Sequence, residues 1–364
     1  MLVRRRILLA LAFGFAVVSL PWAFGQGAGA TDRVRFRNPK KDYAEEVILG
    51  SVAESAGGLK VTLNNKSVVD IAAPNIVFVE YGSLPGLDKV KLDLNSAENQ
   101  GAAAKAKDLY AAEVKKNPTD PKTKRYLEYR EAFWTAKLAD AKVGKDFEAD
   151  APAAIAKLTG FAQEYAKKNA WEVWPTSRTA ARMNAELGKF SEAATVYSFL
   201  AKVDGLPADL KWEARLGEVE MLVRSGNALT SVPLVDEIKK AAGFPKSGPI
   251  AEKMTVLAAV AKALSEKKTK TKPAVEVKAI EDVIAKTTDP VVRAYGHNLL
   301  GELYLQLDLP REAMWELLRV EVVDNLDHEE VVKAVWRLAD AFQKQGDENR
   351  ARAYREKLPT VKGS

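Results

Sequence analysis

Residues 296–320 read GHNLLGELYLQLDLPREAMWELLRV and contain the pattern that decides the fold. Within this stretch, Pro310, Ala313 and Leu317 follow Asp308 at offsets of two, five and nine residues. The same offsets recur in two other sets, Gly188, Phe190, Ala193 and Tyr197, and Gly346, Glu348, Ala351 and Arg355. Small residues such as Gly301 and Ala313 let two helices approach closely, and larger side chains fill the space between them. The pattern therefore predicts a helix pair that recurs along the chain.

This helix pair resembles the tetratricopeptide repeat, a unit of about 34 residues that stacks into a solenoid. The resemblance is clearest at 296–320 and extends to 180–200 and 335–357. The interval from Ala193 to Ala313 has room for about three degenerate repeats. The resemblance implies a mainly α fold, a TPR-like helical-repeat domain over residues 96–364, and a function in binding other proteins or peptides.

The first thirty residues have the features of a signal peptide. Arg4, Arg5 and Arg6 precede an apolar run from Ile7 to Leu20, and Ala28-Gly29-Ala30 supplies small residues for cleavage. An uncleaved anchor is the alternative, but a spanning helix needs about 18–20 apolar residues. We expect cleavage near Ala30 and a periplasmic or extracellular bacterial protein that spans no membrane after cleavage.

Removal of this segment changes the charge balance. The formal net charge is +6, but residues 1–30 contribute three arginines and no Asp, Glu or Lys, so the mature chain carries +3. This near balance argues against nucleic acid as a partner. The chain has no cysteine, which excludes disulfides, thiolate metal sites and a cysteine nucleophile.

Residues 31–95 have the composition of a small all-β domain. The segments 46–53, 59–63, 68–71 and 76–81 are rich in apolar and β-branched residues and are separated by turn signals such as Gly57-Gly58 and Asn64-Asn65. The strand order resembles Sm-like or SH3-like small barrels. A barrel this small has a marginal core, so we expect it to lean on the helical array or on another copy of itself.

From Ala97 onward the period is that of helices. Asp120-Pro121 and Asp289-Pro290 predict helix starts, and Asp327 followed by Glu329 and Glu330 reads as a capping box. Gly188, Gly226, Gly243 and Gly346 predict helix ends. Together these signals indicate roughly a dozen helices joined by short loops.

Nothing in the sequence has the pattern of a catalytic, cofactor or metal site. The chain has two histidines, His297 and His328, and no third group in the sequence is placed to orient either imidazole. Carboxylates such as Glu218 and Glu220 lack the context that a glycosidase requires, which is two carboxylates across a cleft. We therefore expect a non-enzymatic protein without a cofactor.

In the repeat family, the first helix of each pair lines a concave groove. Aligning the repeats places seven candidate partner-binding residues on that face: Arg178, Arg182, Tyr295, Asn298, Glu302, Trp336 and Asp340. Tryptophan and arginine are common anchors at protein interfaces, which favours Trp336 as the strongest member. The register also predicts that Gly301→Leu destabilises the array by about 1–3 kcal/mol, whereas Glu302→Leu costs far less if Glu302 faces the groove.

The sequence thus favours an exported scaffold or adaptor that grips a protein or peptide of the cell envelope. One alternative is a carbohydrate-active protein acting on wall polymer, which would need a carboxylate pair facing a Trp-lined cleft. The other is nucleic-acid binding through the small barrel, which would need a basic stripe with exposed aromatics.

Overall fold

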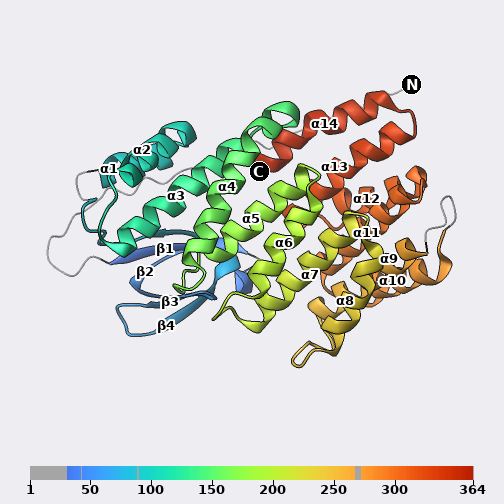
Figure 1. Ribbon diagram of the computed structural model, residues 1–364, viewed down its shortest axis with the longest axis horizontal. Coiled ribbons are helices and arrows are strands. Elements are labelled where there is room, and N and C mark those ends of the chain that lie inside the picture. Colours follow the sequence, from blue (N-terminus) through green and yellow to red (C-terminus); the bar gives the residue numbers. More distant parts are fainter. Residues whose placement is uncertain (1–30, 42, 88–89, 267–271, 364) are drawn as a thin grey trace, which may run out of the picture.

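The computed structural model describes residues 31–41, 43–87, 90–266 and 272–363 (Figure 1). The predicted signal peptide at 1–30 lies outside the described residues. A β-sheet and a long series of helices follow one another along the chain. No helix in the described part is both long and apolar enough to cross a bilayer.

The β segment is a five-stranded antiparallel sheet with the order β4-β3-β2-β1-β5. Its strands are β1 (Asp32–Asn38), β2 (Ala44–Ser55), β3 (Gly58–Thr62), β4 (Val68–Ala72) and β5 (Ile76–Glu80). The first part of β2 pairs with β1 and its last part, from Ser51 to Ser55, pairs with β3. Strands β4 and β5 therefore form the two edges of the sheet.

Fourteen helices follow in the described residues. They are α1 (Lys91–Asn99), α2 (Ala103–Lys115), α3 (Pro121–Asp140), α4 (Gly144–Tyr165), α5 (Val173–Glu186), α6 (Phe190–Ala201), α7 (Ala208–Arg224), α8 (Ala228–Lys240), α9 (Pro249–Ser265), α10 (Ala274–Lys286), α11 (Pro290–Gln306), α12 (Pro310–Val322), α13 (His328–Lys344) and α14 (Glu348–Gly363). The helical part thus begins at Lys91, slightly before the predicted boundary at 96.

The sheet and the helices share one hydrophobic core. Val34 and Leu59 from the sheet belong to the same buried cluster as Trp171, Trp174 and Leu210 from the helical part. Trp171 and Trp174 are 2% and 1% exposed. The small sheet is therefore stabilised by the helical array, which is one of the two arrangements that its marginal core predicts.

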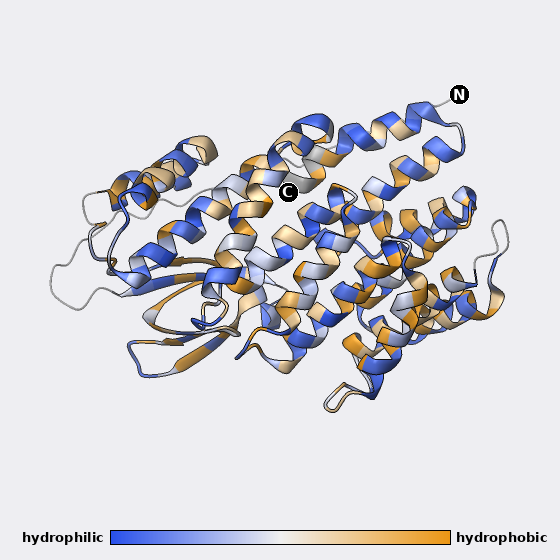
Figure 2. Cartoon of the chain, viewed as in Figure 1, coloured by the Kyte–Doolittle hydropathy of each residue, from blue (hydrophilic) through white to orange (hydrophobic). Residues whose placement is uncertain are grey.

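The helices form a TPR-like solenoid of antiparallel pairs. Helix α5 pairs with α6, and the same arrangement continues through α11 with α12 to α13 with α14 (Figure 1). Hydrophobic and hydrophilic residues are interleaved along these helices (Figure 2), as expected where each helix packs on its neighbours and also meets water. The predicted mainly α fold with a preceding β segment is confirmed.

The turns between paired helices use the residues that the sequence marks. Gly188, Gly226 and Gly346 have φ angles of 73°, 83° and 79°, and Asp308 takes the equivalent place with φ 61°. A left-handed residue at this point ends one helix and lets the chain reverse. The predicted N-caps are confirmed as well, because Asp120 and Asp289 accept hydrogen bonds from the first-turn amides of α3 and α11.

Gly301 lies at a close helix contact, as the repeat pattern predicts. A Cβ atom at Gly301 would lie 2.7 Å from Cγ of Leu317 and 3.4 Å from the carbonyl oxygen of Ala313. Gly217 of α7 has the same role toward α6, since a Cβ there would lie 2.7 Å from the ring of Tyr197. The two 2.7 Å distances are shorter than the separation that two carbon atoms tolerate. Glycine at each position therefore allows the two helices to approach this closely.

Candidate functional site

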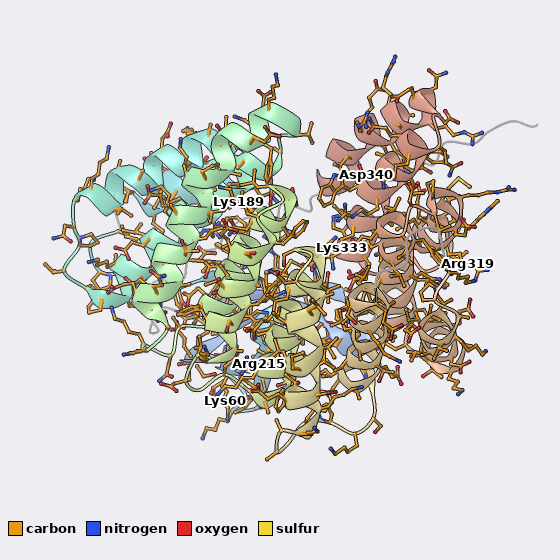
Figure 3. All side chains as sticks on the ribbon, turned by 45° about the vertical axis from the view of Figure 1, so that its right-hand side comes forward. Lys60, Lys189, Arg215, Arg319, Lys333 and Asp340 are labelled. Carbon is orange, nitrogen blue, oxygen red and sulfur yellow. The ribbon has the colours of Figure 1, made fainter. Side chains whose placement is uncertain are left out.

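The candidate site lies where the first helices of successive pairs face one another. Helix α7 packs against α9, α9 against α11, and α11 against α13. All seven predicted groove residues belong to α5, α11 or α13. In Figure 3, Lys333 and Asp340 lie on the side of α13 that is turned toward the α5–α7 part of the array.

Glu302 joins three of these helices from a buried position. Its carboxylate accepts hydrogen bonds from Nε of Arg224 in α7 at 2.8 Å and from Nε of Arg337 in α13 at 3.1 Å. Burial by itself raises the pKa of Glu302, but the two arginines outweigh this and lower the pKa to about 2. Glu302 is 5% exposed. The prediction that its side chain lies open to water in a groove, where substitution would cost little stability, is therefore corrected.

Asn298 and Tyr295 are also internal. Asn298 is 3% exposed, and its amide nitrogen donates to the backbone carbonyl of Glu330 at 2.9 Å and to the Glu330 carboxylate at 2.6 Å. Tyr295 is 4% exposed, and burial raises the pKa of its hydroxyl. Both residues are therefore buried between helices and do not form part of the accessible surface.

Lys333 of α13 extends this network of charged side chains to Glu220 of α7. Its ammonium group lies 2.8 Å from the carboxylate of Glu330 and 3.6 Å from that of Glu220 in α7. Helices that are far apart in sequence are thus joined by charged side chains with little exposure to water. Removing one partner from such a network is costly, because it leaves an unpaired buried charge.

A second link joins α5 to α13 at the solvent-exposed side. Nη2 of Arg178 lies 2.7 Å from the carboxylate of Glu329 in the first turn of α13. Attraction to Arg178 is the main reason that the pKa of Glu329 is lowered. The two side chains are 35% and 51% exposed, so this ion pair remains within reach of a ligand.

Arg182, Trp336 and Asp340 are the other predicted residues that keep partial exposure. Arg182 binds Glu186 at 2.6 Å and Asp140 at 3.0 Å. The guanidinium of Arg337 lies 4.5 Å from the ring of Trp336. The structure therefore divides the predicted set into three internal residues and four accessible ones. We call the accessible four, Arg178, Arg182, Trp336 and Asp340, the groove mouth.

Comparison with known proteins gives matches among solved structures alone. No protein-family model and no curated protein matches this sequence. Eleven solved chains are similar in structure. One of them, a tetratricopeptide repeat protein from Parabacteroides merdae, shares 12% sequence identity with a TM-score of 0.45. The match covers 76% of this chain and 98% of that chain.

His297 has neighbours that the sequence did not reveal. Its Nδ1 lies 2.7 Å from the carboxylate of Glu316, and its Nε2 lies 3.8 Å from that of Asp324. Asp324 also accepts a hydrogen bond from Arg293 at 2.9 Å. Neighbouring carboxylates thus orient the imidazole, contrary to the sequence-based expectation. Among the described residues, no group of three or more His, Cys, Asp or Glu side chains is arranged to hold a metal ion.

Sequence reasoning missed the residues that join α7, α11 and α13. Arg224 and Arg337 grip Glu302, and Glu330 holds both Asn298 and Lys333. Charged residues at helical spacing are ordinary on solvated faces, so their spacing alone does not reveal this role. A clue was available in α13, where Glu330, Lys333 and Arg337 recur at intervals of three and four on one helix face.

Proposed function

We propose that this chain is a non-catalytic scaffold that holds a protein or peptide segment at the groove mouth. The observation that carries the proposal is that Arg178, Arg182, Trp336 and Asp340 are partly exposed above a buried ionic network that fixes α7, α11 and α13. A fixed surface loses little conformational entropy on binding. Trp336 offers an apolar ring, and the charged residues offer hydrogen-bond partners for a peptide backbone and side chains.

The proposal includes export. The Arg-rich start, the apolar run from Ile7 to Leu20 and the small residues at 28–30 support removal of residues 1–30 and a location in the bacterial envelope. Intact-mass measurement of the protein from its native host tests this part. A mature chain beginning near Thr31 is expected, whereas a membrane-bound species that keeps residues 1–30 would contradict it.

The carbohydrate alternative gains no support from the side chains that it requires. Glu218 is bound to Arg215 at 2.7 Å, and Glu220 faces Arg224 at 3.6 Å. Trp171 and Trp174 belong to the core shared with the sheet. Glu218, Glu220, Trp171 and Trp174 are therefore engaged in structural contacts.

One observation favours the nucleic-acid alternative as a second candidate. Arg33, Arg35 and Arg37 occupy every second position of β1 and are all exposed. The guanidinium of Arg35 lies 5.9 Å from the ring of Phe78 in β5, and Tyr43 is 59% exposed. A basic stripe beside aromatic rings is the arrangement that single-stranded nucleic acid binds. The position of β1 between β2 and β5 also supports the Sm-like or SH3-like interpretation of the sheet.

The two candidates are separated by matched variants. Capture of partners from envelope extract with wild type and with Trp336→Ala tests the scaffold. The variant should lose the captured protein while its melting temperature stays close to that of wild type.

For the second candidate, Arg33→Gln/Arg35→Gln/Arg37→Gln should weaken binding of a labelled single-stranded oligonucleotide. The slope of the logarithm of the binding constant against the logarithm of the salt concentration should become shallower by about two. Absence of oligonucleotide binding by wild type would eliminate the second candidate.

A further inference from the structure

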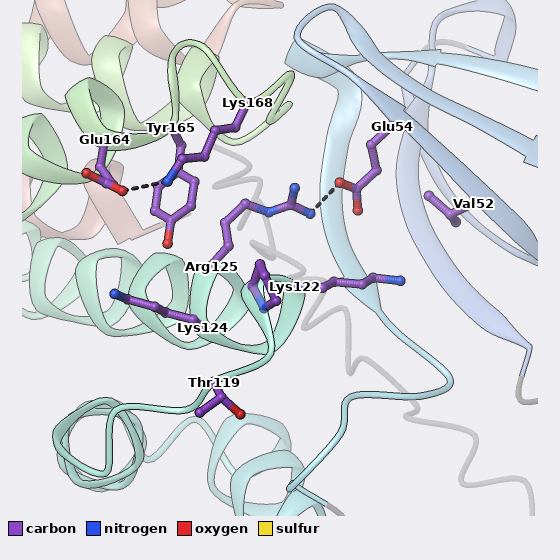
Figure 4. Close-up of a pocket in the computed structure, with 10 residues that line it drawn as sticks. Val52, Glu54, Thr119, Lys122, Lys124, Arg125, Glu164, Tyr165 and Lys168 are labelled. Atoms are coloured by element: carbon purple, nitrogen blue, oxygen red, sulfur yellow. Dashed lines mark hydrogen bonds and ion pairs between the residues drawn. The ribbon is translucent and has the colours of Figure 1, made fainter.

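A cavity of about 720 Å³ opens between the helix-facing side of β2 and the first turn of α3 (Figure 4). Its volume lies in the range of about 300–1,000 Å³ that is common for small-molecule sites. The end of α4 and the residues after it complete the wall. The exposed arginines of β1 pair with exposed residues of β2, whereas the cavity uses the opposite face of the sheet, so the two features are separate.

The lining of the cavity is rich in cations. Its charged residues are Lys122, Lys124, Arg125, Lys168, Glu54 and Glu164. Both carboxylates already have a partner, because Glu54 accepts hydrogen bonds from Arg125 and Tyr81, and Glu164 accepts one from Lys168 at 2.5 Å. Lys122 and Lys124 are therefore the positive charges that the lining itself does not neutralise.

The two lysines are placed against the electrostatic preference of their helix. Helix α3 begins at Pro121, so both lysines lie in its first turn, where the aligned peptide dipoles are already positive. No acidic residue lies within that turn, and the nearest carboxylate along the chain is that of the N-cap Asp120. The ammonium of Lys122 lies 4.1 Å from the ring of Tyr81, and that of Lys124 lies 3.9 Å from Glu128. These contacts stabilise the lysines weakly, and an anion in the cavity would stabilise them more.

Arg125 lines the cavity with a side chain that its carboxylate partners hold in place. The residue is 9% exposed and its guanidinium is held between Glu54 and Glu172, with Nε 3.3 Å from Glu172. Burial raises the pKa of Glu172 to about 7 despite the attraction of Arg125. Near neutral pH, Glu172 therefore supplies only part of a negative charge to this end of the cavity.

We propose that this cavity binds a small organic anion that carries two or more phosphate or carboxylate groups. Lys122 and Lys124 extend in opposite directions from the start of α3 (Figure 4), so each pairs with a separate anionic group of the ligand. Val52 and Tyr165 in the lining offer contacts for an apolar part of the ligand. This site lies at the junction of the sheet and the helices and is independent of the groove mouth.

Isothermal titration calorimetry of the whole mature chain at low salt tests the proposal, with pyrophosphate and citrate as separate probes. Wild type should bind at least one of them, and the preferred probe distinguishes phosphate from carboxylate chemistry. Lys122→Gln/Lys124→Gln should weaken that binding at least tenfold. The matched control is Lys60→Gln/Lys278→Gln, which removes the same charge at exposed positions on β3 and α10 and should change the affinity less than twofold.

Three results would overturn the proposal: binding of neither probe by wild type, equal weakening in the control, or unchanged binding by the cavity variant. Thermal melts of all proteins accompany the titrations. If the cavity double variant melts early, Lys122→Gln and Lys124→Gln are measured singly. Each should then weaken binding at least threefold, and unchanged binding by both would reject the site.

Discussion

Glu302 and Gly301 are neighbours in sequence with different structural roles, and only one of these roles is local. Gly301 is read correctly from the repeat pattern because its partner, Leu317, lies in the same helix pair. The partners of Glu302 are Arg224 and Arg337, in other pairs. A repeat register predicts which helix face a residue occupies, but it does not reveal that the solenoid curves tightly enough to bury that face.

Substitution of Glu302 should therefore cost at least as much stability as substitution of Gly301. Gly301→Leu forces overpacking against Leu317, for which we expect a loss of about 1–3 kcal/mol. Glu302→Leu removes the counter-charge of two arginines with little exposure, for which we expect about 3–5 kcal/mol. Urea denaturation of both variants measures these losses. A loss below about 1 kcal/mol for Glu302→Leu would show that Glu302 is open to water, as the sequence alone suggested.

The pH dependence of stability provides a second test of Glu302. Its folded pKa of about 2 lies below its ordinary value of 4.5. The stabilisation is therefore fully present above pH 4.5 and is lost as pH falls toward about 2, because the unfolded chain takes up the proton first. This shift corresponds to roughly 3 kcal/mol. The stability difference between wild type and Glu302→Gln should shrink by about that amount from about pH 6 to about pH 2. A constant difference would contradict the buried network.

Helices and turns follow from local sequence, whereas strand β1 and the contacts between distant helices do not. Left-handed glycines and aspartate N-caps act within a few residues, so the turns at Gly188 and Gly346 and the start of α3 at Pro121 are predictable. Strand β1 is harder to recognise, because three arginines alternate with its buried Val34 and Phe36. This segment forms a strand by pairing with β2 and β5, which are distant contacts that the local sequence does not reveal. Long-range partners decide such elements.

Two glycines give a matched test at the scale of the helix. Gly188 has φ 73° at the turn between α5 and α6, so Gly188→Ala should destabilise the chain by about 1–2 kcal/mol. Gly160 lies inside α4, and a Cβ there would meet no atom within 4 Å. Gly160→Ala should therefore stabilise the chain by about 0.5–1 kcal/mol. Thermal melts that shift both variants in the same direction would contradict the assignment of these positions.

At the scale of the whole molecule, charged side chains link helices that lie far apart in the sequence. Arg178 and Glu329 are 151 residues apart, yet they form an ion pair between α5 and α13. The sequence predicted the helical array and the four residues of the groove mouth, but it also assigned Tyr295, Asn298 and Glu302 to the open surface. The reason is geometrical, because in a tightly curved solenoid the deeper part of the concave face becomes interior.

The central claim is that the groove mouth, rather than the outer surface, contacts a protein partner. Site-specific photo-crosslinking in the native host tests it most directly, with Trp336→p-benzoylphenylalanine as the probe. The matched control is Trp315→p-benzoylphenylalanine on α12, where the native side chain is 58% exposed. We predict a covalent adduct with another protein from position 336 and none from position 315. An adduct from position 315 alone, the same adduct from both positions, or no adduct from position 336 would contradict the account.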